Sequence, residues 1–275
     1  MQTIFNCAGK LLDLSHPVVM GILNITPDSF YDGGFFPSIT EQLAQVEKML
    51  TEGAAIIDIG AVSTRPGAGF VDESEEINRL LPALTAIKKH FQDSIVSVDT
   101  FRSGVAKRVI ESGAGMINDI YGGRYDMNMI ETVQSAGIPY IIMHLQGDPA
   151  NMQDYPHYKN VVEEVASFFR GQLVKFQNGY DQIILDPGFG FGKKVEHNFQ
   201  LLKELHTLKI LGFPIIAGLS RKSMINKVIH TRPSEALNGT TVLNTIALLK
   251  GADILRVHDV REAVQAIALV SSMKE

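Results

Sequence analysis

The chain has 275 residues, of which 45% are hydrophobic and 20% are charged, and its formal net charge is −5. This composition is ordinary for a globular protein, and the lack of a basic run or stripe in the sequence argues against a nucleic-acid partner. No apolar run reaches the roughly 18 residues of a membrane span and no signal-peptide pattern begins the chain, so with one cysteine, Cys7, we expect a cytoplasmic protein.

The first predicted element is a short hairpin in residues 3–15, and after it one phrase recurs along the chain. In this phrase a glycine is followed by a short apolar run that stops at a polar residue. Glycine ends a helix because it accepts a positive φ, and a short continuous apolar run fits a parallel strand that is buried on both faces. The phrase occurs at residues 53–60, 113–120, 137–144, 179–186, 212–220 and 251–259, and the runs at 18–24 and 94–99 share its form without the glycine.

The segments between these strands have the pattern of amphipathic helices. Residues 40–53 and 73–91 place apolar side chains at i, i+3, i+4 and i+7, with Thr40 as the expected N-cap of the first helix. Eight strand–helix units in about 250 residues is the count of a TIM barrel, whereas an open doubly wound sheet, the alternative, usually has fewer strands. We therefore predict an α/β TIM (β/α)8 barrel whose floor is capped by the hairpin. No linker-like segment divides the chain, so residues 1–275 are expected to form one domain.

The chemistry of a TIM barrel lies where its strands end, because all the C-terminal ends open on one face. Taken singly, a strand-end Asn or Asp often caps a turn, and a lone histidine often has only a structural role. Many polar side chains around one partly dry mouth are costly unless a ligand satisfies them, which favours a binding site. The predicted strands end near Asn24, Gly60, Asp99, Asp119, His144, Asp186, Leu219 and Val257.

The side chains near these strand ends describe the expected ligand. The carboxylates Asp99 and Asp186 require a donor-rich edge, and Asn118 can both donate and accept. The cations Lys222 and Arg256 require an anionic part. The ligand is therefore expected to combine a hydrogen-bonding face with a negatively charged group.

Three other kinds of site are disfavoured by spacing. A zinc site would need a Cys cluster or an H-E-x-x-H motif, and the sequence has neither. A Ser–His–Asp hydrolase would be expected to carry a G-x-S-x-G elbow, which is also missing from the sequence. The loop 186-DPGFGFGK-193 is not a nucleotide P-loop, because its glycines are too dense and no Ser or Thr follows Lys193.

A series of motifs from Val18 to Val260 resembles the dihydropteroate synthase family. The resemblance implies a TIM-barrel transferase of folate biosynthesis that joins 6-hydroxymethyl-7,8-dihydropterin pyrophosphate to p-aminobenzoate, giving 7,8-dihydropteroate and pyrophosphate. It also implies dependence on Mg²⁺, a homodimer and inhibition by sulfonamides. The motifs are MGILNITPDSFYDGG, STRPGA, SVDT, INDI, MHLQGDP, LDPGFGFGK, GLSRKS and RVHDV.

The resemblance also implies a role for individual residues. The pterin site would consist of Asp99, Asn118, Met143, Asp186, Phe191, Lys222 and Arg256. Among these, the catalytic residues would be Asp99, Asp186, Lys222 and Arg256. The pyrophosphate site would consist of Asn24, Thr64, Arg65, Arg256 and His258, with Asn24 also binding Mg²⁺. The p-aminobenzoate site would consist of Phe30, Pro66, Lys222 and Ser223.

These roles are chemically sensible. The Asp186 carboxylate can accept from the 2-amino group and the adjacent ring N–H of a pterin as a two-pronged fork. The Arg256 guanidinium can lie over the flat ring, as an ammonium cannot. As fixed charges, Asp99 and Asp186 would stabilise a pterin cation formed in a dissociative reaction. Asp58, inside a predicted strand, is expected to be structural.

Three rival functions remain open at this point. A methyltransferase that passes a methyl group from methyltetrahydrofolate to a corrinoid would lack the STRPG and SRKS motifs. A non-catalytic pterin-binding protein should have lost Asn24, Arg65 or Lys222, and a Schiff-base aldolase would need Lys222 away from Arg221. The chain departs from the usual family residues at Tyr31 and at 61–62, and we expect these changes to affect loop motion or sulfonamide affinity rather than function.

Overall fold

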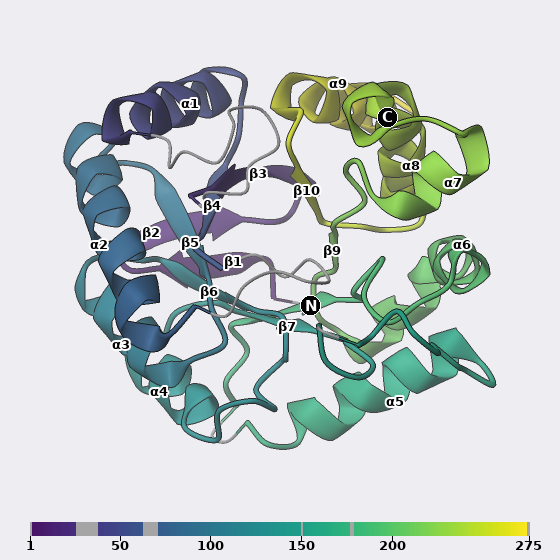
Figure 1. Cartoon of the computed structure of the whole chain (residues 1–275), viewed down its shortest axis with the longest axis horizontal. Helices are drawn as coiled ribbons and strands as arrows, with labels where there is room; N and C mark the ends of the chain where they lie inside the picture. The colour runs from purple at the N-terminus through teal and green to yellow at the C-terminus, as the bar shows by residue number, and fades with distance from the viewer. Residues whose placement is uncertain (1, 26–37, 63–70, 150, 177–178, 274–275) are drawn as a thin grey trace.

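The computed structural model describes residues 2–25, 38–62, 71–149, 151–176 and 179–273 as a barrel of parallel strands ringed by helices (Figure 1). A hairpin of two strands, β1 (Ile4–Cys7) and β2 (Lys10–Asp13), precedes the barrel. The barrel strands are β3 (Val18–Asn24), β4 (Ile56–Gly60), β5 (Ile95–Asp99), β6 (Met116–Asp119), β7 (Tyr140–Met143), β8 (Ile183–Asp186), β9 (Ile216–Ala217) and β10 (Ile254–Val257). The helices are α1 (Ile39–Thr51), α2 (Glu73–His90), α3 (Ser103–Glu111), α4 (Met129–Ala136), α5 (Val161–Leu173), α6 (Val195–Lys203), η1 (Leu205–Leu211), α7 (Ser223–Ile229), η2 (Pro233–Glu235), α8 (Leu237–Leu249) and α9 (Val260–Ser271).

The strand order identifies a barrel and excludes a doubly wound sheet. Hydrogen-bonded neighbours follow the order β8-β7-β6-β5-β4-β3-β10-β9, so the last strands lie beside the first. The ring closes between β8 and β9, where the Leu185 N–H donates to the Pro214 carbonyl at 2.9 Å and Leu185 bridges to Ile215. A doubly wound sheet would reverse its strand order near the middle, and this one does not.

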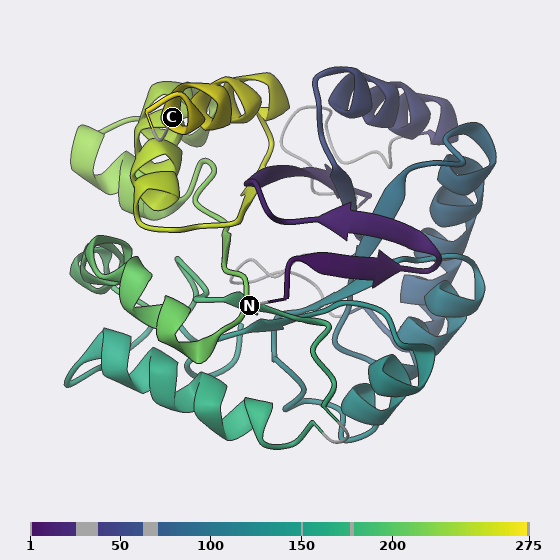
Figure 2. The ribbon, with the colours of Figure 1, turned by 180° about the vertical axis from the view of Figure 1, so that it is seen from behind.

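The floor of the barrel is apolar and is covered by the hairpin, as the sequence predicted. Figure 2 shows β1 and β2 lying across this end of the barrel. Phe5, Cys7, Leu12 and Leu14 of the hairpin segment form one buried cluster with a single side chain from each barrel strand. Those strand residues are Met20, Ile56, Ile95, Met116, Ile141, Ile184, Ile216 and Ile254.

The outer helices begin close to the predicted positions, but the cap of α1 differs. Ser38, not Thr40, is the N-cap: its hydroxyl accepts from the Glu41 N–H at 3.3 Å, and the Glu41 carboxylate accepts from the Ser38 N–H at 2.7 Å. This reciprocal capping box satisfies two helix-end donors and typically stabilises a helix by about 1 kcal/mol. Within the described ranges, none of the helices has the length and apolar character needed to cross a membrane.

Candidate active site

The inward face of the barrel becomes polar two residues beyond the apolar floor. Side chains alternate across a strand, so each residue two positions past a floor residue also points into the barrel. The strand registers agree with this alternation, since Asp58 pairs with Ser97 and Asp99 pairs with Asn118. The second tier contains Ile22, Asp58, Ser97, Asn118, Met143, Asp186, Gly218 and Arg256.

Asp58, which was expected to be structural, lies at the centre of a buried network of predicted site residues. Its Oδ2 accepts from Arg256 Nε at 2.7 Å and from Arg256 Nη2 at 2.6 Å. The same oxygen accepts from Asn118 Nδ2 at 3.2 Å. Asp58 is fully buried, and its Oδ1 has no partner among the described residues. Asp58 thus orients two of the predicted pterin residues instead of serving the fold alone.

Asp99 shares Arg256 with Asp58 but is held less tightly. Its Oδ2 lies 3.3 Å from the terminal Arg256 nitrogen. Burial raises the pKa of Asp99 to about 8, and the positive charge of Arg256 opposes this rise while Asp58 adds to it. Burial lowers the pKa of Arg256, but the two carboxylates outweigh burial and raise the pKa above its ordinary value. Asp99 thus shares one guanidinium with Asp58, and burial outweighs the effect of that guanidinium on the pKa of Asp99.

Asp186 and Lys222 face each other across the β8–β9 seam. The Asp186 Oδ1 accepts from the Gly188 N–H at 2.7 Å, and Lys222 Nζ donates to the Phe189 carbonyl. Lys222 Nζ also lies 4.9 Å from the centre of the Phe191 ring. Burial raises the pKa of Asp186, and the nearby Lys222 charge opposes it. Burial lowers the pKa of Lys222 to about 8, and Asp186 opposes that shift.

An apolar wall stands beside these charges. Met143, at the end of β7, is buried in a cluster with Ile120, Leu145 and Met152, against which Phe191 packs. A flat ring could therefore contact apolar side chains on one side and charged groups at its edge.

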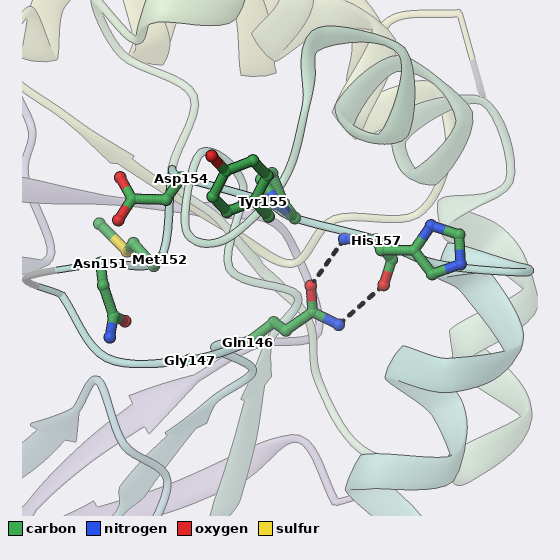
Figure 3. Close-up of a pocket in the computed structure, with 8 residues that line it drawn as sticks. Gln146, Gly147, Asn151, Met152, Asp154, Tyr155 and His157 are labelled. Carbon is green, nitrogen blue, oxygen red and sulfur yellow. Dashed lines mark hydrogen bonds between the residues drawn. The ribbon is translucent and has the colours of Figure 1, made fainter.

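A loop beyond β7 supplies part of this wall and lines an open pocket of about 340 Å³ (Figure 3). The Gln146 side chain accepts from the His157 N–H at 3.0 Å and donates to the His157 carbonyl at 2.9 Å. These two bonds close the loop, which carries Met152 into the apolar cluster. Gln153 donates to the Gly190 carbonyl. The loop therefore also contacts residues 187–192, the glycine turn that follows β8.

Three predicted site residues lie on the rim. Asn24 ends β3 and is exposed, and Ser223 is the exposed first residue of α7. His258 follows β10, and its Nδ1 lies 2.9 Å from the Ser220 hydroxyl. The four remaining predicted residues lie outside the described part of the chain, and their roles stay predictions. They are Phe30, Thr64, Arg65 and Pro66.

Two strand-end residues considered for the mouth face away from it. Asp119 follows inward-facing Asn118 and therefore points outward, where it accepts from the Tyr140 hydroxyl at 2.6 Å and the Gly123 N–H at 2.8 Å. His144 also lies outside the barrel interior, and its Nδ1 is 2.9 Å from Lys193 Nζ. Both residues therefore have structural roles, which is the alternative given above for a single Asp or His at a strand end.

The donor set suits a hard cation with few protein ligands. Among the described residues there is no group of three or more His, Cys, Asp or Glu side chains that could hold a metal. The exposed Asn24 amide offers one oxygen at the rim. Mg²⁺ commonly keeps several waters and takes few protein oxygens together with substrate phosphate, so Asn24 is compatible with that ion.

The chain is similar along most of its length to known proteins. The pattern of the family described as pterin binding enzyme matches residues 20–258. The dihydropteroate synthase of Haemophilus influenzae is 46% identical over 254 residues, which cover 91% of this chain and 92% of that protein. The solved structure of Yersinia pestis dihydropteroate synthase in a sulfonamide drug complex is 40% identical with a TM-score of 0.93, covering 98% of this chain and 99% of that one. The Xanthomonas albilineans dihydropteroate synthase solved with 4-aminobenzoic acid is 36% identical with a TM-score of 0.91, covering 100% and 99%.

Proposed function

Because this chain belongs to the dihydropteroate synthase family of pterin-binding enzymes, we propose that it joins 6-hydroxymethyl-7,8-dihydropterin pyrophosphate to p-aminobenzoate. The products are 7,8-dihydropteroate and pyrophosphate, and the reaction is a step of folate biosynthesis. The observation that carries this proposal is the inward-facing set of Asp186, Asn118 and Arg256 in one tier of the barrel. The relatives favour this reaction over a corrinoid methyltransferase or a Schiff-base aldolase.

The pterin is proposed to lie in the second tier. Its 2-amino group and the neighbouring ring N–H would donate to Asp186, while Asn118 meets the adjacent ring edge and Asp99 a further ring N–H. Hydrogen bonds to charged groups contribute roughly 1.5–3 kcal/mol each. Arg256, oriented by Asp58, would lie over the ring, and Lys222 would donate to the pterin carbonyl edge. The apolar wall at Met143 would cover the opposite face.

The other substrate groups are proposed to meet the rim. Asn24 and His258 would face the pyrophosphate, and Asn24 would hold Mg²⁺, which when bound neutralises charge on the leaving group. Ser223, next to Lys222, would donate to the carboxylate of p-aminobenzoate. Phe30, Thr64, Arg65 and Pro66 would complete these two sites.

A dissociative route suits the fixed charges. The carbon–oxygen bond to pyrophosphate breaks first, its electron pair leaves with the oxygen, and a delocalised pterin cation remains. Asp99 and Asp186 would stabilise this cation before the neutral amine of p-aminobenzoate attacks the exocyclic carbon and loses a proton. Positional isotope exchange within the pyrophosphate, in the absence of p-aminobenzoate, tests this route. A complete lack of exchange alongside second-order displacement would contradict it.

The activity itself is tested by pyrophosphate release from the pterin substrate. The full mixture of pterin substrate, p-aminobenzoate and Mg²⁺ should form dihydropteroate with equal release of pyrophosphate. Omission of p-aminobenzoate should prevent product formation, and chelation of Mg²⁺ should strongly slow it. No dihydropteroate from the complete mixture would defeat the proposed function.

Pterin affinity is expected to pass through a maximum near pH 8. Affinity rises as Asp99 loses its proton and can accept a ring N–H, and it falls as Lys222 loses the proton it donates; both have a pKa of about 8. In the protein without ligand, the raised pKa of Asp99 means that the free energy of unfolding falls as the pH rises toward about 8. Calorimetric titrations should measure pterin affinity across this pH range. The acid limb of the profile, which is the loss of affinity toward low pH, should be missing in Asp99→Asn. An unchanged acid limb in that variant would assign the titration to another group.

Ser223→Ala is expected to raise the KM for p-aminobenzoate about tenfold, because one hydrogen bond to a carboxylate is lost at an exposed position. The KM for the pterin substrate should not change. Ser234→Ala, at an exposed position in η2, is the matched control. Equal increases in both KM values would show that Ser223 does not belong to the p-aminobenzoate site alone.

A homodimer is also proposed. Helices α8 and α9 pack together and expose apolar side chains that include Val242, Leu249 and Leu269. A second copy covering such a surface would remove it from water. Light scattering should give about twice the 30.2 kDa of one chain, and a mass of one chain at working concentration would contradict the dimer.

A further inference from the structure

A lysine is buried beneath the glycine turn that follows β8. Lys193 is 3% exposed, and its Nζ lies 2.9 Å from the Gly188 carbonyl and 3.1 Å from the Phe191 carbonyl. The Nδ1 of His144 is also 2.9 Å away, and the His144 carbonyl is at 3.4 Å. The proposed reaction uses neither Lys193 nor His144, so this contact needs its own explanation.

The acceptors around Lys193 match a charged ammonium. An ammonium has three N–H donors, and the three shortest contacts are to three acceptors. Burial lowers the pKa of His144 to about 2, so its ring is neutral and can accept at Nδ1 while the proton sits on Nε2. A neutral amine would have only two donors, enough for the two carbonyls, and would then have to accept from a proton on His144 Nδ1.

The ammonium joins the glycine turn to the end of β7. The turn approaches β7 so closely that a Cβ on Gly188, whose φ is +69°, would meet the His144 carbonyl carbon at 3.0 Å. The same turn places the Gly188 N–H on Asp186 and the Phe189 carbonyl on Lys222. Movement of the turn would therefore disturb both of these charged groups together.

We propose that Lys193 is a positioning residue whose buried ammonium clamps the glycine turn against His144 and so sets the places of Asp186, Lys222 and Phe191 around the pterin. This role rests on the proposed function only for its effect on pterin binding. The clamp itself is a property of the folded chain. Lys193 contacts the turn and His144, and the substrate would meet only the groups that the turn supports.

The charge of Lys193 also acts on Asp186. The charged groups facing Lys193 are Asp186 from β8 and Lys222 from beyond β9, while the neutral His144 faces it from β7. Burial lowers the pKa of Lys193 well below its ordinary value, Asp186 opposes this shift and Lys222 adds to it. The two carbonyls and the neutral imidazole around Nζ can accept from an ammonium. In return, Lys193 helps to lower the pKa of Asp186 against the effect of burial. Removal of this charge should shift the ionisation of Asp186 to higher pH.

The clamp can be tested in the unmodified protein by ¹⁵N NMR at pH 7. The expected result is a slowly exchanging ammonium signal for Lys193 in through-space contact with the His144 ring, and a His144 ring protonated at Nε2. A neutral amine at Lys193, or a proton on His144 Nδ1, would overturn the proposal. This measurement requires no variant and no ligand, so its result does not depend on the proposed reaction.

The effect on binding is tested with Lys193→Met, which keeps an unbranched side chain as far as Cε and removes the charged nitrogen. We expect the Kd for 6-hydroxymethyl-7,8-dihydropterin to rise at least about tenfold, because the turn and Asp186 are both disturbed. The pH at which Asp186 ionises, followed by ¹³C NMR of its carboxyl carbon, should also rise, a shift that loss of packing alone would not cause. Lys194→Met, at the exposed neighbouring position, should match the unmodified protein.

Unchanged pterin affinity together with an unshifted ionisation of Asp186 in Lys193→Met would overturn the positioning role. If Lys193→Met fails to fold, the NMR result on the unmodified protein decides. If the unmodified protein binds no pterin, the proposed function fails, while the NMR result still decides whether the clamp exists.

Discussion

Asp186→Asn is expected to lower kcat/KM for the pterin substrate about a thousandfold, equivalent to about 4 kcal/mol of transition-state stabilisation. The carboxylate would accept two pterin donors, whereas an amide presents one acceptor and turns an NH2 group toward the second donor. The variant should still fold, since an Asn oxygen can accept the Gly188 N–H that Asp186 accepts at 2.7 Å. Steady-state kinetics with the pterin substrate varied would measure this loss.

The stability of the same variant should move in the other direction. Burial raises the pKa of Asp186, so its ionised form costs folding free energy at pH values above the ordinary pKa of an Asp. Asp186→Asn removes that cost, and its Tm at pH 8 should equal or exceed that of the unmodified protein. Asp181→Asn, at an exposed position before β8, is the matched control and should change neither quantity. If both Tm and activity fell strongly, the loss of activity would be explained by destabilisation of the fold and not by loss of contacts to the pterin.

The strand-end residues of the site were predictable because parallel strands buried on both faces have a clear pattern. The apolar runs ending at Asp99 and Asp186 stop where the structure ends β5 and β8. Closure of the barrel then brings residues far apart in sequence to one mouth, as between Arg256 and Asp99. The resemblance to a known family added roles that strand endings alone could not supply.

Asp58 was not predicted as a site residue because it lies inside β4, whereas the predicted carboxylates Asp99 and Asp186 end their strands. Its run, 56-IIDIG-60, contains a charged residue two positions after Ile56, which packs on the floor. Alternation therefore places Asp58 on the inner face, and the same rule sends Asp119 outward after Asn118. The sequence therefore distinguishes the two aspartates: Asp58 lies two positions after a floor residue, Ile56, and Asp119 lies three positions after another, Met116.

Other features depend on different kinds of information. The cap of α1 was readable, since 38-SITE-41 has the spacing of a capping box, and choosing Thr40 overlooked it. The clamp at Lys193 was not readable, because it joins a turn to a neighbouring strand end 49 positions away in sequence. Such a contact follows from how the strands are placed beside one another and from close backbone approach at Gly188.

Asp58→Asn is expected to lower the free energy of unfolding by about 3 kcal/mol, the range typical when one partner of a buried ion pair is removed. Among the described residues, Arg256 would keep Asp99, at 3.3 Å, as its ion-pair partner. The Arg256 side chain should move toward Asp99 and away from the position over the pterin in which Asp58 holds it. Because two oriented hydrogen bonds are disturbed, kcat/KM should fall about a hundredfold. Urea unfolding and steady-state kinetics measure the two effects.

The pH dependence separates loss of Asp58 from general destabilisation. Asp58 helps to raise the pKa of Asp99, so its neutral replacement should lower that pKa, as should the closer approach of Arg256. The acid limb of pterin binding should therefore move below its position near pH 8. Asp119→Asn supplies the contrast: it is equally buried on a neighbouring part of the barrel, but it faces outward to the Tyr140 hydroxyl. It should lose stability with a smaller shift of the limb, because the charge of Asp119 also raises the pKa of Asp99 but less than that of Asp58 does. An equal shift in both variants would show that Asp58 does not control Asp99 through Arg256.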